Sequence, residues 1–168
     1  YAEAMTRVIA NLATAFKDNP GAPALLKGTG RDETHLVIVA TADRGLCGAF
    51  NTNIIRASER FLKEHAGQQV EMVLVGRKGR DYFRRRPVTI AQELTAIFAR
   101  LDYSHAKQIA AEVISAYSEK KTDAVFLIYN EFKSVISQRL AVEQLLPLAP
   151  FQAAPGAVMI FIEDDAIP

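Results

Sequence analysis

The feature that most constrains the fold is an alternation of short, almost wholly apolar runs with longer segments of helical periodicity. The apolar runs are HLVIVATA at 35–42, VEMVLVG at 70–76 and DAVFLIY at 123–129. Apolar residues recur at helical spacing through 50–66 and 104–120. Strands that are apolar on both faces are typical of parallel sheets covered on both sides. We therefore expect an α/β fold, with a mostly parallel sheet, helices on both faces and right-handed crossovers.

The remaining segments complete this Rossmann-like pattern. VTIAQEL at 88–94 is a weaker strand candidate, and the basic segment before it predicts a short helix that Pro87 ends. The stretch 132–148 follows its strand across only Asn130 and Glu131, which predicts an antiparallel hairpin near the C-terminus. One further strand is expected at 157–162.

Composition limits the functional classes. The net charge is +1, so no global field favours nucleic acid or an acidic membrane, and no apolar run reaches the roughly 20 residues that span a bilayer. The single cysteine excludes an internal disulfide. Three dispersed histidines offer no metal-ligand spacing. We expect no cofactor, no nucleic acid partner and no direct membrane span.

The loop TADRGLCGAFN, between a predicted strand and a predicted helix, is the first candidate site. Such a turn can activate a thiol, cradle an anion with its backbone amides, or present a side chain to a partner. The glycine spacing matches neither a dinucleotide fingerprint nor a P-loop, so the glycines more simply permit a tight turn, and Asp43 is a candidate cap for local amides. The candidate residues are Asp43, Arg44, Gly45, Leu46, Cys47 and Gly48.

Cys47 is weighed separately because it is the only thiol. A nucleophilic cysteine needs a base, and the sequence places none of His35, His65 and His105 beside it. A free cysteine more often packs as a small apolar side chain. We therefore expect a packed thiol, while Arg44 stays available to a partner.

The segment GRKGRDYFRRR is the second candidate site. Its cations face a single acid, Asp81. A solvated face, a protein-binding patch and a surface that binds the phosphates of a nucleic acid all fit this density. Tyr82 and Phe83 are adjacent, so they point to different sides of a helix, and at least one is expected in the core. The cations are Arg77, Lys78, Arg80, Arg84, Arg85 and Arg86.

Four motifs in this order resemble the γ subunit of the rotary F-type ATP synthase. The resemblance covers the whole chain, and its order makes it more specific than any single motif. The motifs are TADRGLCGAFN at 41–51, VGRKGRDYFRRR at 75–86, YNEFKSVISQ at 129–138 and QLLPL at 144–148.

The resemblance implies a non-catalytic rotor subunit of the central stalk. It would transmit torque between the membrane c ring and the catalytic α and β subunits, which bind ATP, and would also meet the ε subunit. It implies residues 1–17 as the remnant of a long N-terminal helix, 18–162 as the globular domain, and 163–168 as the start of a truncated C-terminal helix. The expected location is peripheral, on the cytoplasmic face of the bacterial inner membrane.

By the same resemblance, the loop from Asp43 to Gly48 lies beside the β subunits, with Arg44 facing an acidic β loop. The partner of the segment 77–86 stays open between ε, the c ring and solvent. The cysteine pair of the chloroplast forms is missing, so thiol switching is not expected. The alternative reading is a small phosphate- or nucleotide-binding α/β enzyme that uses the 43–48 turn.

Overall fold

The computed structural model describes residues 2–16, 18–134 and 137–148 of the 168-residue chain. The strands are β1 (Thr34–Ala40), β2 (Gln69–Val75), β3 (Thr89–Leu94), β4 (Ala124–Ser134) and β5 (Ser137–Leu146). The helices are α1 (Ala2–Ala15), α2 (Ala24–Lys27), α3 (Phe50–Glu64), α4 (Arg77–Phe83), the 3₁₀ helix η1 (Ile97–Arg100) and α5 (Tyr103–Ser118).

The described strands form one sheet in the order β3-β2-β1-β4-β5. β1 pairs in parallel with both β2 and β4, β2 pairs in parallel with β3, and β4 pairs antiparallel with β5. The predicted mostly parallel α/β fold with a C-terminal hairpin is confirmed. The order reverses beside β1, so the carboxyl ends of β1 and β4 flank a topological switch point, where open α/β sheets usually form their sites.

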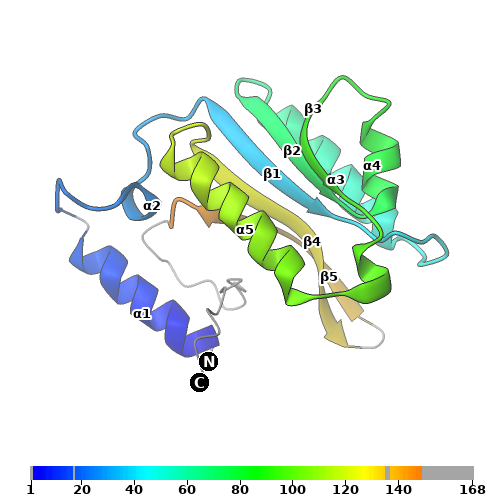
Figure 1. Ribbon diagram of the computed structural model, residues 1–168, viewed down its shortest axis with the longest axis horizontal. Helices are drawn as coiled ribbons and strands as arrows, with labels where there is room; N and C mark the ends of the chain where they lie inside the picture. The colour runs from blue at the N-terminus through cyan, green and yellow to red at the C-terminus, as the bar shows by residue number, and fades with distance from the viewer. Residues whose placement is uncertain (1, 17, 135–136, 149–168) are drawn as a thin grey trace.

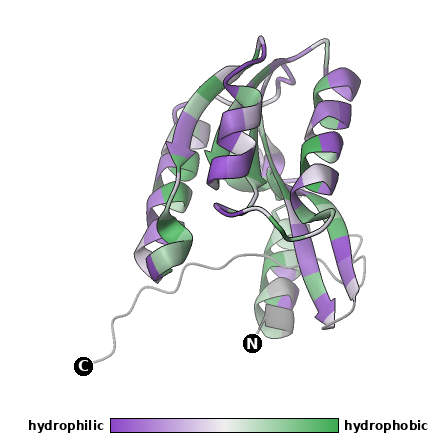
Figure 2. Cartoon of the chain, turned by 90° about the vertical axis from the view of Figure 1, so that its right-hand side faces the viewer, coloured by the Kyte–Doolittle hydropathy of each residue, from purple (hydrophilic) through white to green (hydrophobic). Residues whose placement is uncertain are grey.

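Helices cover the sheet on both faces (Figure 1). On one face, Val37 and Val39 of β1 pack in a buried cluster with Ile54 and Phe61 of α3. On the other face, α5 contributes Val113 and Tyr117 to a second buried cluster. Figure 2 shows hydrophobic and hydrophilic residues mixed along these helices, as expected for helices with one face on the core. Burial on both faces makes the sheet a well-packed base for its loops.

The hairpin turn does not lie where the sequence placed it. Asn130 and Glu131 belong to β4 and pair with Leu140 and Arg139, so the prediction of a turn at these two residues is wrong. The Glu131 carboxylate accepts hydrogen bonds from Lys133 and Arg139, which satisfies an acid inside the strand. The strand predicted at 157–162 and the helix start at 163–168 lie outside the described residues.

α1 confirms the helix predicted at the start of the chain. Its Val8 and Leu12 side chains are 51% and 45% exposed. Figure 1 shows α1 set away from the sheet, so within the described residues the sheet does not cover this apolar side. Among the described residues, no helix is both long and apolar enough to cross a membrane.

Candidate partner-binding site

The carboxyl end of β1 and the start of α4 are packed backbone against backbone. Gly76 has φ +91°, and a Cβ there would lie 2.1 Å from the Thr41 carbonyl oxygen. A Cβ at Gly79 would lie 2.9 Å from Thr41 Oγ1. The Thr41 hydroxyl accepts from the Gly79 amide at 2.8 Å and donates to the Val75 carbonyl at 3.0 Å. The two glycines therefore allow α4 to lie directly on the end of β1.

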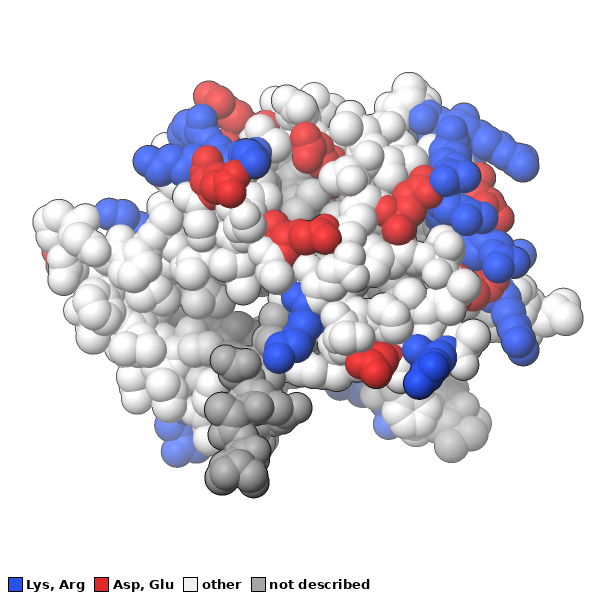
Figure 3. Space-filling view, viewed as in Figure 1, with Lys and Arg blue, Asp and Glu red and all other residues white. Residues whose placement is uncertain are grey.

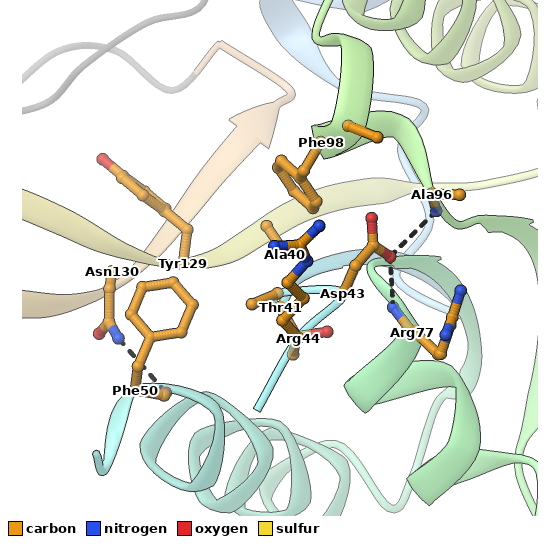
Figure 4. Close-up of a pocket in the computed structure, with 12 residues that line it drawn as sticks. Ala40, Thr41, Asp43, Arg44, Phe50, Arg77, Ala96, Phe98, Tyr129 and Asn130 are labelled. Atoms are coloured by element: carbon orange, nitrogen blue, oxygen red, sulfur yellow. Dashed lines mark hydrogen bonds between the residues drawn. The ribbon is translucent and has the colours of Figure 1, made fainter. Parts of the chain in front are cut away.

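Asp43 joins three elements at this point. Its Oδ1 accepts hydrogen bonds from the Arg77 amide at 2.9 Å and the Ala96 amide at 3.0 Å (Figure 4). Its Oδ2 is buried and has no hydrogen-bond partner among the described residues. The prediction that Asp43 caps local amides is wrong, because the amides that it accepts belong to α4 and the β3–η1 connection rather than to its own loop. The carboxylate thus fixes the loop to its neighbours.

The rest of the loop turns outward into solvent. Leu46 and Gly48 have φ of +63° and +56°, and Leu46 is fully exposed. Asn51, in the first turn of α3, accepts from the Ala42 amide at 2.9 Å and so anchors the base of the loop. The exposed tip therefore extends from a fixed base.

The expectation that Cys47 is a packed thiol is wrong, because Cys47 is exposed. The left-handed residues on either side of it turn the chain away from the core. Its Sγ accepts a hydrogen bond from Asn51 Nδ2 at 3.1 Å. This contact is local to the loop, so Cys47 contributes nothing to the hydrophobic core.

The structure brings the loop and the start of α4 into one basic surface. A Cβ at Gly45 would lie 3.4 Å from Lys78 Nζ, and the Lys78 amide donates to the Ala42 carbonyl at 3.1 Å. Arg44, Arg77 and Lys78 are exposed, and none of them forms an ion pair with a described residue. We call these three residues the basic edge.

Three of the four later cations of the predicted patch are instead paired within the chain, whereas Arg85 is exposed and forms no ion pair with a described residue. Figure 3 shows acids interspersed among the basic side chains on the side that carries α4. The hydrogen bond from Arg84 lowers the pKa of Glu93, and the bond from Arg80 lowers the pKa of Asp81. The structure therefore divides the predicted 77–86 patch. The pairs are Arg80 with Asp81, Arg84 with Glu93 and Arg86 with Glu59.

The two aromatic residues of this segment are also engaged. Phe83 is fully buried, as predicted for at least one of the pair. The Tyr82 hydroxyl donates to the Glu59 carboxylate, which raises the pKa of Tyr82, and Arg86 lies 3.3 Å above the Tyr82 ring centroid. A base stacking on either ring would have to displace these contacts, which weighs against nucleic acid binding.

A cavity of about 920 Å³ opens at the switch point. We call it the carboxyl-edge cavity. Its aromatic walls come from α3, η1 and β4, and Arg44 and Arg77 lie on its lining. The aromatic residues are Phe50, Phe98 and Tyr129.

Three amides beside the 43–48 turn are not available to a phosphate. The Arg77 and Ala96 amides already donate to Asp43, and the Phe50 amide at the start of α3 donates to the Cys47 carbonyl at 3.2 Å. A bound phosphate needs such amides free. Within the described ranges, no group of three His, Cys, Asp or Glu side chains is arranged to hold a metal ion. The charged, exposed surface that remains is suited to a protein partner.

The sequence analysis missed the residues that position this surface. Thr41, Gly76 and Gly79 fix α4 on β1, and Asn51 fixes the loop. The two glycines of VGRKG, directly after a strand, were the available signal, because glycine there marks close backbone approach. Nothing in the sequence pattern singled out Asn51.

Fold and site together define a Rossmann-like domain. Its switch point carries the Asp43 carboxylate and the exposed basic edge. Residues 1–166 match the family model described as ATP synthase. The chain is 41% identical to the ATP synthase gamma chain of Solibacter usitatus, covering 92% of this chain and 55% of that one. It is 44% identical to the gamma chain of an Anaeromyxobacter species, and the match covers 96% of this chain and 57% of that one. The chain belongs to the ATP synthase gamma-chain family.

The chain thus spans a little over half the length of these curated relatives. Among solved structures, it resembles a chain of the Tetrahymena thermophila mitochondrial ATP synthase central stalk and c ring. That match has a TM-score of 0.60 and 28% identity, and covers 87% of this chain and 72% of the other. The structural likeness therefore agrees with the sequence relatives.

Proposed function

We propose that this chain is the globular part of a rotor in a proton-translocating ATP synthase. In this role it transmits torque between the membrane c ring and the catalytic α and β subunits, and catalyses no reaction itself. The observation that carries the proposal is the identity of 41% and 44% to two gamma chains over more than nine-tenths of the chain.

The packing of the domain supports a mechanical role. An element that passes torque must resist shear, and close-packed interiors have low compressibility. Three neighbouring strands are parallel and buried between helices, and the central β1 has Val37 and Val39 fully buried. The Asp43 carboxylate and the Gly76 contact add rigid links where β1 meets α4. A load applied to the loop would therefore reach the sheet directly.

The basic edge supplies the proposed contact with the catalytic subunits. Arg44 is exposed on the loop from Asp43 to Gly48, and in this proposal it faces an acidic loop of the β subunit. Complementary charges of this kind set encounter rate and angular preference more than total affinity. The ε subunit and the c ring are proposed as further partners of the domain.

The proposal also covers the division of the chain and its location. Residues 1–17 are taken as part of a long helix, which accounts for the exposed apolar side of α1 at Val8 and Leu12. Residues 18–162 are taken as the globular domain and 163–168 as the start of a second long helix. The protein would lie peripherally at the cytoplasmic face of the bacterial inner membrane.

Reconstitution tests the proposed function. The chain is expressed from its full reading frame, mixed with α and β subunits, and assayed for assembly and ATP hydrolysis. We expect a complex that hydrolyses ATP, binding of ε to the stalk in a pull-down, and no turnover by the purified chain alone. ATP turnover by the pure chain, or failure to assemble with α and β, would contradict the proposal.

A further inference from the structure

We propose that the carboxyl-edge cavity binds an acidic segment of a partner protein by enclosing one bulky apolar side chain of that segment. The inference rests on the proposed contact between the basic edge and an acidic partner. It adds the place where the partner is anchored and the type of residue that anchors it.

The walls of the cavity favour an apolar anchor. Phe98 lines the cavity and is 46% exposed, and Phe50 and Tyr129 line it as well. Large apolar side chains that line a cavity and stay exposed are typical of binding sites rather than of free surface. A volume of about 920 Å³ lies within the usual range of ligand pockets, so it accommodates a large side chain with its neighbouring backbone.

Tyr129 presents an uncharged ring to the cavity. Its hydroxyl donates to the Glu143 carboxylate at 3.2 Å. Burial, with the charge of Glu143, raises the pKa of Tyr129 to about 12, so the ring stays neutral at physiological pH. The polar end of this side chain is thus already engaged, and the aromatic ring is left for the anchor.

The charges around the cavity favour an acidic segment. Asp43 is the one carboxylate among the described lining residues, and its Oδ1 already accepts two amides. The guanidinium groups of Arg44 and Arg77 form no ion pair within the described part of the chain. A second copy of this chain would bring two basic edges together, and like charges across an interface are unfavourable. Acidic residues flanking an apolar anchor are therefore the complementary partner.

A peptide-binding experiment tests the anchor. The probe is a fluorescein-labelled peptide of glutamate and alanine with one central phenylalanine, and its companion has alanine in place of the phenylalanine. We expect saturable binding of the first peptide to the protein expressed from its full reading frame. Removal of the anchor in the companion peptide, or of the cavity wall in Phe98→Ala, should weaken binding by about tenfold or more.

Phe132→Ala is the matched control, because Phe132 is 69% exposed on the hairpin and lies outside the cavity lining. It should leave the affinity unchanged. If both peptides bind equally and Phe98→Ala has no effect, the anchor is overturned while the charge contact stands. Displacement of the peptide by ATP, or self-association that Phe98→Ala abolishes, would assign the cavity to another occupant and also overturn the inference.

Discussion

The basic edge and the arginines that follow it in the chain, Arg84 and Arg86, differ in what their charges meet. Arg44, Arg77 and Lys78 are exposed and have no acidic partner among the described residues. Arg84 instead pairs with Glu93, and Arg86 with Glu59. A cation paired within its own chain has less charge to offer a partner. The comparison teaches that a run of like charges in sequence need not be one functional surface.

The largest expected effect comes from the contact that positions the basic edge. Gly76→Ala places a methyl group 2.1 Å from the Thr41 carbonyl oxygen at φ +91°, so α4 must shift. We expect a loss of about 3 kcal/mol or more in the free energy of unfolding, measured in urea. Gly67→Ala is the control, because a Cβ there meets no atom within 4 Å. Equal effects of the two changes would contradict the close packing.

The next largest effect is expected from the buried carboxylate of Asp123. Exposed ion pairs, by comparison, contribute little to the free energy of unfolding. Burial raises the pKa of Asp123, but hydrogen bonds from Thr29 and the Glu33 and Thr34 amides, with the charge of Arg31, outweigh it and lower the pKa from 3.8 to about 2. This corresponds to about 2 kcal/mol of stability. Because the folded-state pKa is lowered, the contribution is complete well above pH 3.8 and is lost as the pH falls toward 2.

Urea unfolding between pH 7 and pH 2 measures this contribution. Asp123→Asn should remove about 2 kcal/mol at pH 7 and flatten the acid limb of the profile. Glu93→Gln, in the more exposed pair with Arg84, should cost less than about 1 kcal/mol. An acid limb that Asp123→Asn leaves unchanged would show that this carboxylate does not set the acid stability.

Asp43 tests whether the loop and α4 act as one unit. Asp43→Ala removes the acceptor of the Arg77 and Ala96 amides. Because the site is only half-buried, we expect a loss of about 1.5 kcal/mol. Faster hydrogen exchange at those two amides is expected as well. Asp81→Ala, at an exposed pair, serves as control, and a loss of equal size there would contradict the role of Asp43.

The smallest expected effect on stability separates the two kinds of arginine. Arg44→Ala should change the free energy of unfolding by less than about 0.5 kcal/mol, because the side chain forms no ion pair with a described residue. Arg84→Ala should cost more than Arg44→Ala, and the cost should shrink in high salt. Thermal unfolding at two salt concentrations measures both. A larger loss from Arg44→Ala would mean that Arg44 has a structural role.

The fold could be predicted because its strands are apolar on both faces and its helices keep a clear period. The position of the hairpin turn could not, because β4 continues through Asn130 and Glu131, whose polar side chains are satisfied within the hairpin and by the Phe50 carbonyl. A polar pair after an apolar run is typical of a turn. Only the partner strand shows that it is not one.

The candidate site could be predicted only in part. The sequence indicated both Arg44 and the segment 77–86, since charge is visible residue by residue. It did not show that Glu59 lies beside Arg86, or that the Asp43 carboxylate reaches Arg77, because these contacts join elements distant in the chain. Cys47 was misplaced because burial of a loop residue depends on backbone direction at Leu46 and Gly48.

The most direct test compares two triple variants of equal charge change. One replaces the basic edge, Arg44, Arg77 and Lys78, with alanine, and the other replaces Arg80, Arg84 and Arg86. Affinity of the full-length protein for the α and β assembly is measured over a range of salt concentrations. The basic-edge variant should bind roughly tenfold more weakly with a flatter salt dependence, while the other loses stability but keeps its affinity. Equal losses of affinity in both variants would contradict the assignment of partner binding to the basic edge.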